Sequence, residues 1–100
     1  MAFHYVYILQ SDSHPNQLYT GQTSNLNQRL QAHNSGKVSH TSKFLPWHIR
    51  SAIAFRSRDR ALAFERYLKS GSGRAFLKRH LSATSGRAGG LKEGEPLKAD

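Results

Sequence analysis

The sequence has no cysteine, only six acidic residues among 100, and no long hydrophobic run. Without cysteine the chain cannot form a disulfide scaffold, a thiolate metal site or a cysteine nucleophile. Its apolar runs stay well below the roughly 18 residues that a membrane-spanning helix needs. The first residues also lack the basic and apolar regions of a signal peptide. We therefore expect one small cytoplasmic domain with no membrane partner.

Positive charge is abundant and falls in the part of the chain that should fold. Fifteen lysines and arginines give a formal net charge of +9. Before Ser82 only Asp12, Asp59 and Glu65 are acidic, whereas cations and acids balance after it. A basic domain of this kind favours a polyanionic partner, which we expect to be nucleic acid. The alternatives are a charge that serves only solubility and a basic face that docks an acidic protein.

Hydrophobic periodicity predicts three strands and three helices. Residues 3–10 are rich in aromatic and β-branched residues and apolar on both faces, as in a central, covered strand. Ser24 and Ser72 are expected to cap the first and third helices. The expected strands are 3–10, 17–21 and 47–55, and the expected helices are 26–33, 60–69 and 74–81. This order, β-β-α-β-α-α, predicts an α+β fold with a small, mostly antiparallel three-stranded sheet flanked by helices.

The strand pattern also gives an expected register. The turn between the first two strands is short, so they should form an antiparallel hairpin. Its centre would place Tyr7 opposite Tyr19 or Thr20. In the third strand, strict alternation would direct Ile49 and Phe55 to the same face. The stretch between the first helix and the third strand is expected to be a loop.

The composition changes after residue 82. Residues 83–100 are polar and rich in glycine, and Leu91 and Leu97 are their only large apolar residues. Such a segment buries too little apolar surface to offset its conformational entropy. We expect a folded domain over residues 1–82 and a disordered tail over residues 83–100.

Glu65 is the acidic residue of greatest chemical interest. It borders the apolar face of the predicted second helix, among lysines and arginines. A lone carboxylate can hold a divalent cation whose shell is completed by water and phosphate oxygens. The structural alternative is an i,i+4 ion pair with Lys69, worth a few tenths of a kcal/mol.

Arg29 and His33 also lie four residues apart, on the predicted first helix. Arginine supplies a permanent charge and several donors for phosphate, and histidine can move a proton near neutral pH. A solvated arginine and a half-buried structural histidine are the alternatives. Tyr7 and Tyr19 lie on the predicted hairpin, where most tyrosines serve packing, and a phenol needs nearby cations to act as a base. The spacing of the histidines does not match that of a zinc site. The sequence also has no nucleotide-binding glycine loop, so we expect no small-molecule cofactor.

Four blocks of the sequence carry a family resemblance. They are Tyr5-Val6-Tyr7, Tyr19-Thr20-Gly21, residues 25–37 around Arg29 and His33, and residues 64–74 around Glu65. In this order they resemble the GIY-YIG endonuclease family, and in particular its small single-domain bacterial members. The resemblance covers about residues 3 to 81, nearly the whole predicted domain.

The resemblance implies a metal-dependent endonuclease that hydrolyses phosphodiester bonds in DNA, and structure selectivity is an option that it leaves open. Tyr7 and Tyr19 would be the two motif tyrosines, one of which positions or deprotonates the attacking water. Arg29 would stabilise the phosphate charge, and His33 would assist proton transfer or bond a motif tyrosine. Glu65 would hold a single Mg²⁺ or Mn²⁺.

The remaining prediction concerns DNA contacts outside the site. No base-reading motif is present, so binding should be mostly electrostatic. The expected phosphate contacts are Lys37, Lys43, Arg56, Arg58, Arg60 and Arg74. The alternative function is a non-catalytic nucleic-acid-binding module with a nuclease-like fold.

Overall fold

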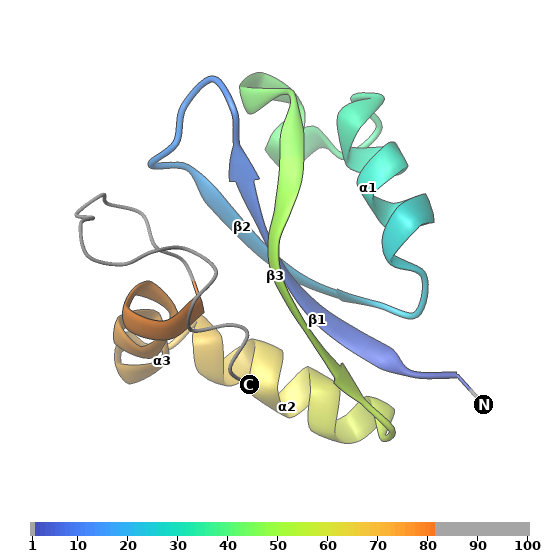
Figure 1. The fold of residues 1–100 in the computed structure, drawn as a ribbon, viewed down its shortest axis with the longest axis vertical. Coiled ribbons are helices and arrows are strands. Elements are labelled where there is room, and N and C mark those ends of the chain that lie inside the picture. Colours follow the sequence, from blue (N-terminus) through green and yellow to red (C-terminus); the bar gives the residue numbers. More distant parts are fainter. Residues whose placement is uncertain (1, 82–100) are drawn as a thin grey trace.

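A three-stranded antiparallel sheet forms the centre of the protein (Figure 1). The computed structural model describes residues 2–81. The strands are β1 (His4–Ser11), β2 (Leu18–Thr23) and β3 (Trp47–Phe55), in the order β2-β1-β3. The central strand β1 carries Val6, Ile8 and Leu9, which are almost completely buried. The predicted fold class is therefore confirmed, including the covered central strand.

The helices complete the predicted order β-β-α-β-α-α, with three differences in detail. Asn25 rather than Ser24 caps the first helix, because its side chain accepts the Gln28 backbone N–H. The expected loop contains a short 3-10 helix, and the third helix starts earlier than expected, after Ser70, and ends in a π-helical turn. The helical elements are α1 (Leu26–Asn34), η1 (Ser39–Phe44), α2 (Arg58–Leu68), α3 (Gly71–Phe76) and η2 (Leu77–Leu81).

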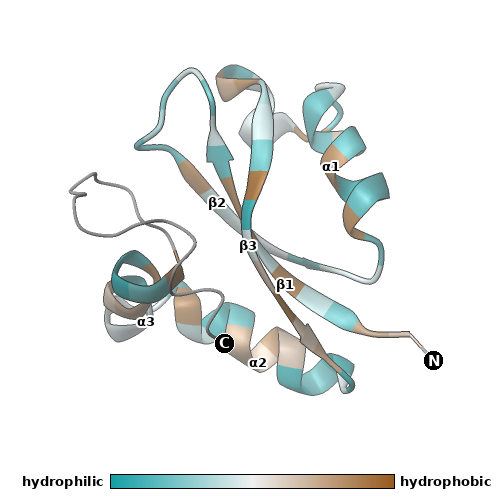
Figure 2. Cartoon of the chain, in the orientation of Figure 1, coloured by the Kyte–Doolittle hydropathy of each residue, from teal (hydrophilic) through white to brown (hydrophobic). Residues whose placement is uncertain are grey.

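Two layers of helices cover the two faces of the sheet, and each face has its own hydrophobic cluster. On one face Tyr7, Leu9 and Trp47 pack under α1 and η1. On the other face Val6 and Ile8 pack against the helices α2 and α3 and the turn η2. Hydrophobic colour lies along the strands between these layers, whereas the surface of α1 is mostly hydrophilic (Figure 2).

The hairpin register differs by one residue from the expected range. Tyr7 pairs with Gly21, and Leu9 pairs with Tyr19. The Ser11 backbone N–H donates to the Gln17 carbonyl at 3.1 Å, which makes the turn symmetric about His14. The hairpin centre expected from the sequence lies between Ser13 and His14, half a residue earlier, so the predicted partner of Tyr7 was wrong.

A β-bulge in β3 overturns the predicted alternation of that strand. Ile8 pairs with Ser51 and Leu9 with Ile49, so Arg50 is an extra residue between two consecutive pairs. The extra residue reverses the side-chain direction on either side of it. Ile49 therefore packs in the layer of α1, whereas Phe55 packs in the layer of α2.

Two sequence-based expectations concern features beyond these elements. The disordered tail predicted for residues 83–100 lies outside the described residues, as does the last residue of the predicted domain, Ser82. Within residues 2–81 no helix is both long enough and apolar enough to cross a membrane.

The close approach of α2 and α3 gives a stability prediction. A Cβ added to Gly73 would lie 1.7 Å from the Tyr67 carbonyl oxygen, whereas a Cβ added to Gly71 meets nothing within 4 Å. We expect Gly73→Ala to lower the free energy of unfolding by about 2 kcal/mol or more, because the two helix backbones must separate. Gly71→Ala, in the same helix, should leave it unchanged or raise it by up to about 1 kcal/mol.

Urea denaturation of both variants, followed by circular dichroism, measures this difference. Equal stability of the two alanine variants would show that α2 and α3 do not pack so closely.

Candidate active site

The ring of Tyr7 lies over Gly21, its partner on the neighbouring strand. A Cβ at position 21 would lie 2.5 Å from the Tyr7 hydroxyl oxygen and 3.1 Å from Cε2 of Tyr19. Glycine is therefore required at this position for steric reasons, because any side chain would displace the phenol. The hairpin thus brings the first tyrosine of the site to the second, with ring centroids 6.3 Å apart.

His33, from α1, completes a buried cluster with the two tyrosines. Its Nε2 lies 3.0 Å from the Tyr7 hydroxyl oxygen, within hydrogen-bond distance. The centroid of its ring lies 4.8 Å from that of Tyr19. Tyr7 is 2% exposed and His33 is fully buried, whereas Tyr19 is only half-buried. Of the two tyrosines, Tyr19 is therefore the one more accessible to solvent.

The second ring nitrogen of His33 contacts a residue that the sequence did not single out. Its Nδ1 lies 2.9 Å from Oγ1 of Thr41, which is buried in η1. Thr41 stands in a polar stretch that also contains Ser39 and Ser42, and nothing in the sequence distinguishes it from them. Only the fold shows which hydroxyl faces the imidazole.

Burial and nearby charges perturb the acid–base properties of this cluster. Burial raises the pKa of Tyr7 above its usual value of 10. Tyr19 and the charge of Glu65 add to this effect, and the charge of Arg29 opposes it. Burial, together with the Arg29 charge, lowers the pKa of His33 below its usual 6.5. Both rings are therefore neutral at pH 7, and a neutral histidine can accept a proton.

Arg29 and Glu65 lie on helices of opposite layers of the fold. Arg29 is an exposed residue of α1, and Glu65 belongs to α2, which contacts all three strands. Their charges shift the pKa of the Tyr7 phenol in opposite directions. Of the five candidate residues, the two tyrosines and His33 are therefore in direct contact, and the two charged residues influence Tyr7 electrostatically.

The alternative interpretation of Glu65 is also present in the structure. The Lys69 ammonium donates to Oε2 of Glu65 at 2.9 Å, as the i,i+4 spacing allows. The Glu65 side chain is 19% exposed and that of Lys69 is 53% exposed. Within residues 2–81 no group of three or more histidine or acidic side chains is arranged to hold a metal ion. A cation at Glu65 would therefore not have three such protein ligands from the described residues.

The predicted DNA contacts do not form one patch. All six residues are exposed, but they divide between the two layers of helices. One residue precedes η1 and one lies within it, beside α1. The other four lie on α2 or α3 or just before α2. The first group is Lys37 and Lys43, and the second is Arg56, Arg58, Arg60 and Arg74.

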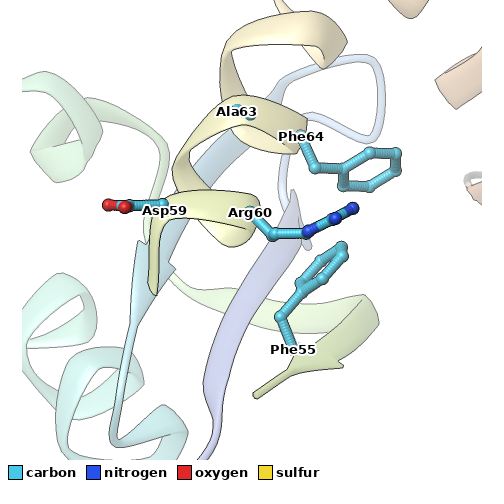
Figure 3. Close-up of a pocket in the computed structure, with 5 residues that line it drawn as sticks. All are labelled: Phe55, Asp59, Arg60, Ala63 and Phe64. Carbon is cyan, nitrogen blue, oxygen red and sulfur yellow. The ribbon is translucent and has the colours of Figure 1, made fainter. Parts of the chain in front are cut away.

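Two of these arginines lie beside aromatic side chains: Arg56 lies over the Phe3 ring, and Arg60 lies at Phe55 and Phe64. Arg60 lines an open hollow together with Phe55, Phe64, Asp59 and Ala63 (Figure 3). The rings of Phe55 and Phe64 are themselves in contact, with centroids 5.6 Å apart. Arg60 therefore has a packing role on the face away from the tyrosines, in addition to any contact with phosphate.

Comparisons with known proteins agree with this arrangement. Residues 3–82 match the model of the GIY-YIG catalytic domain. The chain is 37% identical over 79 residues to a UPF0213 protein of Staphylococcus haemolyticus, covering 78% of this chain and 94% of that protein. A UPF0213 protein of Lactococcus lactis is 34% identical over 70 residues, 69% of each chain.

A solved structure shows the same architecture. The solution NMR structure of a UPF0213 protein from Bacillus halodurans is 29% identical and superposes with a TM-score of 0.50. The match covers 82% of this chain and 88% of that one. The catalytic-domain match spans most of the chain, so the protein belongs to the GIY-YIG family of nucleases, and its relatives there are small bacterial UPF0213 proteins.

Proposed function

We propose that the protein is a divalent-metal-dependent endonuclease that hydrolyses phosphodiester bonds in DNA. The observation that carries this proposal is the buried hydrogen bond between Tyr7 and His33, within reach of the charges of Arg29 and Glu65. Phosphodiester hydrolysis needs a base for water, a cation for the transition state and charge neutralisation of the phosphate. These groups supply each requirement.

Tyr7 and His33 act together as the base. The raised pKa of Tyr7 keeps its proton in place at neutral pH, so the phenol needs a proton acceptor of its own. His33 Nε2 is that acceptor, at 3.0 Å. As the Tyr7 proton moves to His33, the phenol oxygen takes a proton from the attacking water, and the oxygen of that water forms a bond to phosphorus. The bond to the leaving oxygen then breaks, and solvent protonates that oxygen.

Arg29 stabilises charge at two points of this reaction. Its guanidinium lowers the pKa of Tyr7 and so favours the transient phenolate. A guanidinium also presents several donors to phosphate oxygens, which gain negative charge in the transition state. Tyr19, half-buried beside both rings, positions the water or the phosphate.

A single Mg²⁺ or Mn²⁺ fits the donor set at Glu65. Magnesium is commonly held by one or two carboxylates together with substrate phosphates and water, and Glu65 offers one partly exposed carboxylate. When bound, the ion would supply charge neutralisation of the phosphate and help to activate water. Because the protein contributes one ligand, the ion should bind weakly until DNA adds phosphate oxygens.

The first prediction separates the metal role of Glu65 from its ion pair. Glu65→Gln keeps the shape and removes the charge, so metal-dependent cleavage should fall by orders of magnitude. Lys69→Ala removes the same ion pair but leaves the carboxylate, so cleavage should be kept or rise. Both variants and the parent are incubated with linear, nicked, flapped and supercoiled DNA, with Mg²⁺ or Mn²⁺, which also tests structure selectivity.

Two outcomes count against the assignments. Equal loss in Glu65→Gln and Lys69→Ala would show that the carboxylate matters only through its ion pair. A parent protein that binds DNA but cuts none of the four forms with either metal would favour the non-catalytic binding module.

The second prediction concerns pH. His33 must be neutral to accept the Tyr7 proton, and its folded-state pKa lies below the usual 6.5. Cleavage should therefore be level around pH 7 and fall as the pH drops through the lowered pKa. The unfolded chain binds the proton first, so the free energy of unfolding should also decrease as the pH falls below about 6.5.

Rates of cleavage and urea midpoints between pH 5 and 8 measure both effects. The decrease in stability should be smaller in His33→Gln, which has no imidazole to protonate. An identical pH dependence of stability in parent and variant would contradict a buried, neutral His33.

The third prediction concerns DNA affinity. The logarithm of the binding constant should fall linearly with the logarithm of salt concentration, because phosphate contacts release counterions. Lys43→Ala, on the layer of α1, should reduce the slope by about one if DNA lies against this layer. Arg58→Ala is the matched variant on the layer of α2. Fluorescence anisotropy with a labelled duplex between about 50 and 200 mM salt measures the slopes, and an affinity indifferent to salt would contradict the proposal.

A further inference from the structure

Three buried polar groups form a row that ends inside η1. Tyr7 contacts Nε2 of His33, and Nδ1 of His33 contacts Oγ1 of Thr41. Oγ1 of Thr41 in turn lies 3.2 Å from the Val38 carbonyl oxygen, which it contacts as a donor. The contacts therefore run from β1 through α1 to η1 without an exposed member.

The number of available protons determines which group donates in each hydrogen bond of this row. The threonine hydroxyl has one proton, and a carbonyl oxygen can only accept. If the Thr41 hydroxyl donates to Val38, its oxygen must accept from His33, so the imidazole proton lies on Nδ1. A neutral imidazole has a single N–H, which leaves Nε2 as an acceptor for the Tyr7 hydroxyl.

The reverse direction satisfies fewer groups. If Thr41 donates to Nδ1, then the imidazole proton lies on Nε2 and points at the Tyr7 oxygen. No acceptor within residues 2–81 is then left for the Tyr7 hydroxyl proton. A buried donor without an acceptor costs about 1–3 kcal/mol, so the first direction is favoured.

Thr41 is held in place by contacts of its own. The Trp47 indole N–H donates to the Thr41 carbonyl oxygen at 2.9 Å. The Asn34 side chain holds the Trp47 backbone on both sides, because its Oδ1 accepts from Trp47 N at 2.6 Å and its Nδ2 donates to Trp47 O at 2.9 Å. Thr41 is 1% exposed, which leaves little room for water to replace its hydroxyl.

We propose that Thr41 is a positioning residue that fixes the tautomer of His33. Its hydroxyl accepts the Nδ1 proton and thereby keeps Nε2 unprotonated and directed at Tyr7. The catalytic consequence rests on the proposed function, because only a base at Nε2 needs this tautomer. In serine proteases a buried carboxylate holds the catalytic histidine in the same way, and its loss leaves the geometry intact but the tautomer wrong.

The tautomer can be measured without any cleavage assay. Imidazole ¹⁵N chemical shifts of the parent protein near pH 7.5 distinguish a protonated nitrogen from an unprotonated one. We expect the His33 Nδ1 to be protonated and the Nε2 to be unprotonated. The opposite assignment would overturn the proposal, whether or not the protein cuts DNA.

Variants then test the role of the hydroxyl. Thr41→Val keeps the shape and removes the acceptor, so the His33 signals should shift toward the Nε2–H tautomer. The kcat for DNA cleavage should fall roughly 10–100-fold, the range known for lost hydrogen-bond partners of metal-binding histidines, with KM nearly unchanged. Thr41→Ser should restore both the tautomer and kcat.

Thr23→Val is the matched control. Thr23 is also largely buried, and within the described part of the chain its hydroxyl bonds to the backbone of Asn25 at the start of α1. Its removal should lower stability but leave the His33 spectrum as in the parent. An unchanged spectrum in Thr41→Val, or a changed one in Thr23→Val, would overturn the proposal. A parent that shows the expected tautomer but no cleavage would instead contradict the proposed endonuclease.

Discussion

The phenol of Tyr7 occupies the space that a side chain at position 21 would fill, and the arrangement of the site depends on this contact. Gly21 lets the ring lie over the neighbouring strand, where its hydroxyl meets His33. That contact ties the hairpin to α1, and Thr41 ties the same histidine to η1. One missing side chain therefore lets three separate segments converge on a single buried imidazole.

Burial and nearby charges together determine the protonation state of the site. Burial makes both the ionised phenol and the ionised imidazole unfavourable, so the resting pair is neutral. Arg29 and Glu65 act on Tyr7 with opposite signs from different helices. Under the proposed function, a cation or a phosphate that enters the site would change this balance, so the substrate would influence the acid–base chemistry.

The elements of the fold follow from local patterns, and this is why they could be predicted. The aromatic strand β1 and the apolar spacing of α2 are each readable over a few residues, and the motif blocks pointed to Arg29, His33 and Glu65. The caps of α1 and α3 were each placed on a nearby serine instead of the residue that forms them. Features that depend on a single residue of register were missed, as with the partner of Tyr7 and the bulge at Arg50. Thr41 was missed because its contact with His33 arises where η1 folds back onto α1. Hydropathy and residue spacing do not encode that contact.

The bulge at Arg50 divides β3 into two halves whose large apolar side chains pack in different layers. The first half, with Trp47 and Ile49, belongs to the layer of the tyrosines, and the second half, ending at Phe55, belongs to the opposite layer. A volume change at Trp47 or Ile49 acts first on the layer of the tyrosines, and one at Phe55 acts first on the opposite layer, so compensating substitutions should arise within a layer rather than along the strand. Loss of one residue at the bulge would exchange the layers of one half, which makes this position far less tolerant of deletion than of substitution.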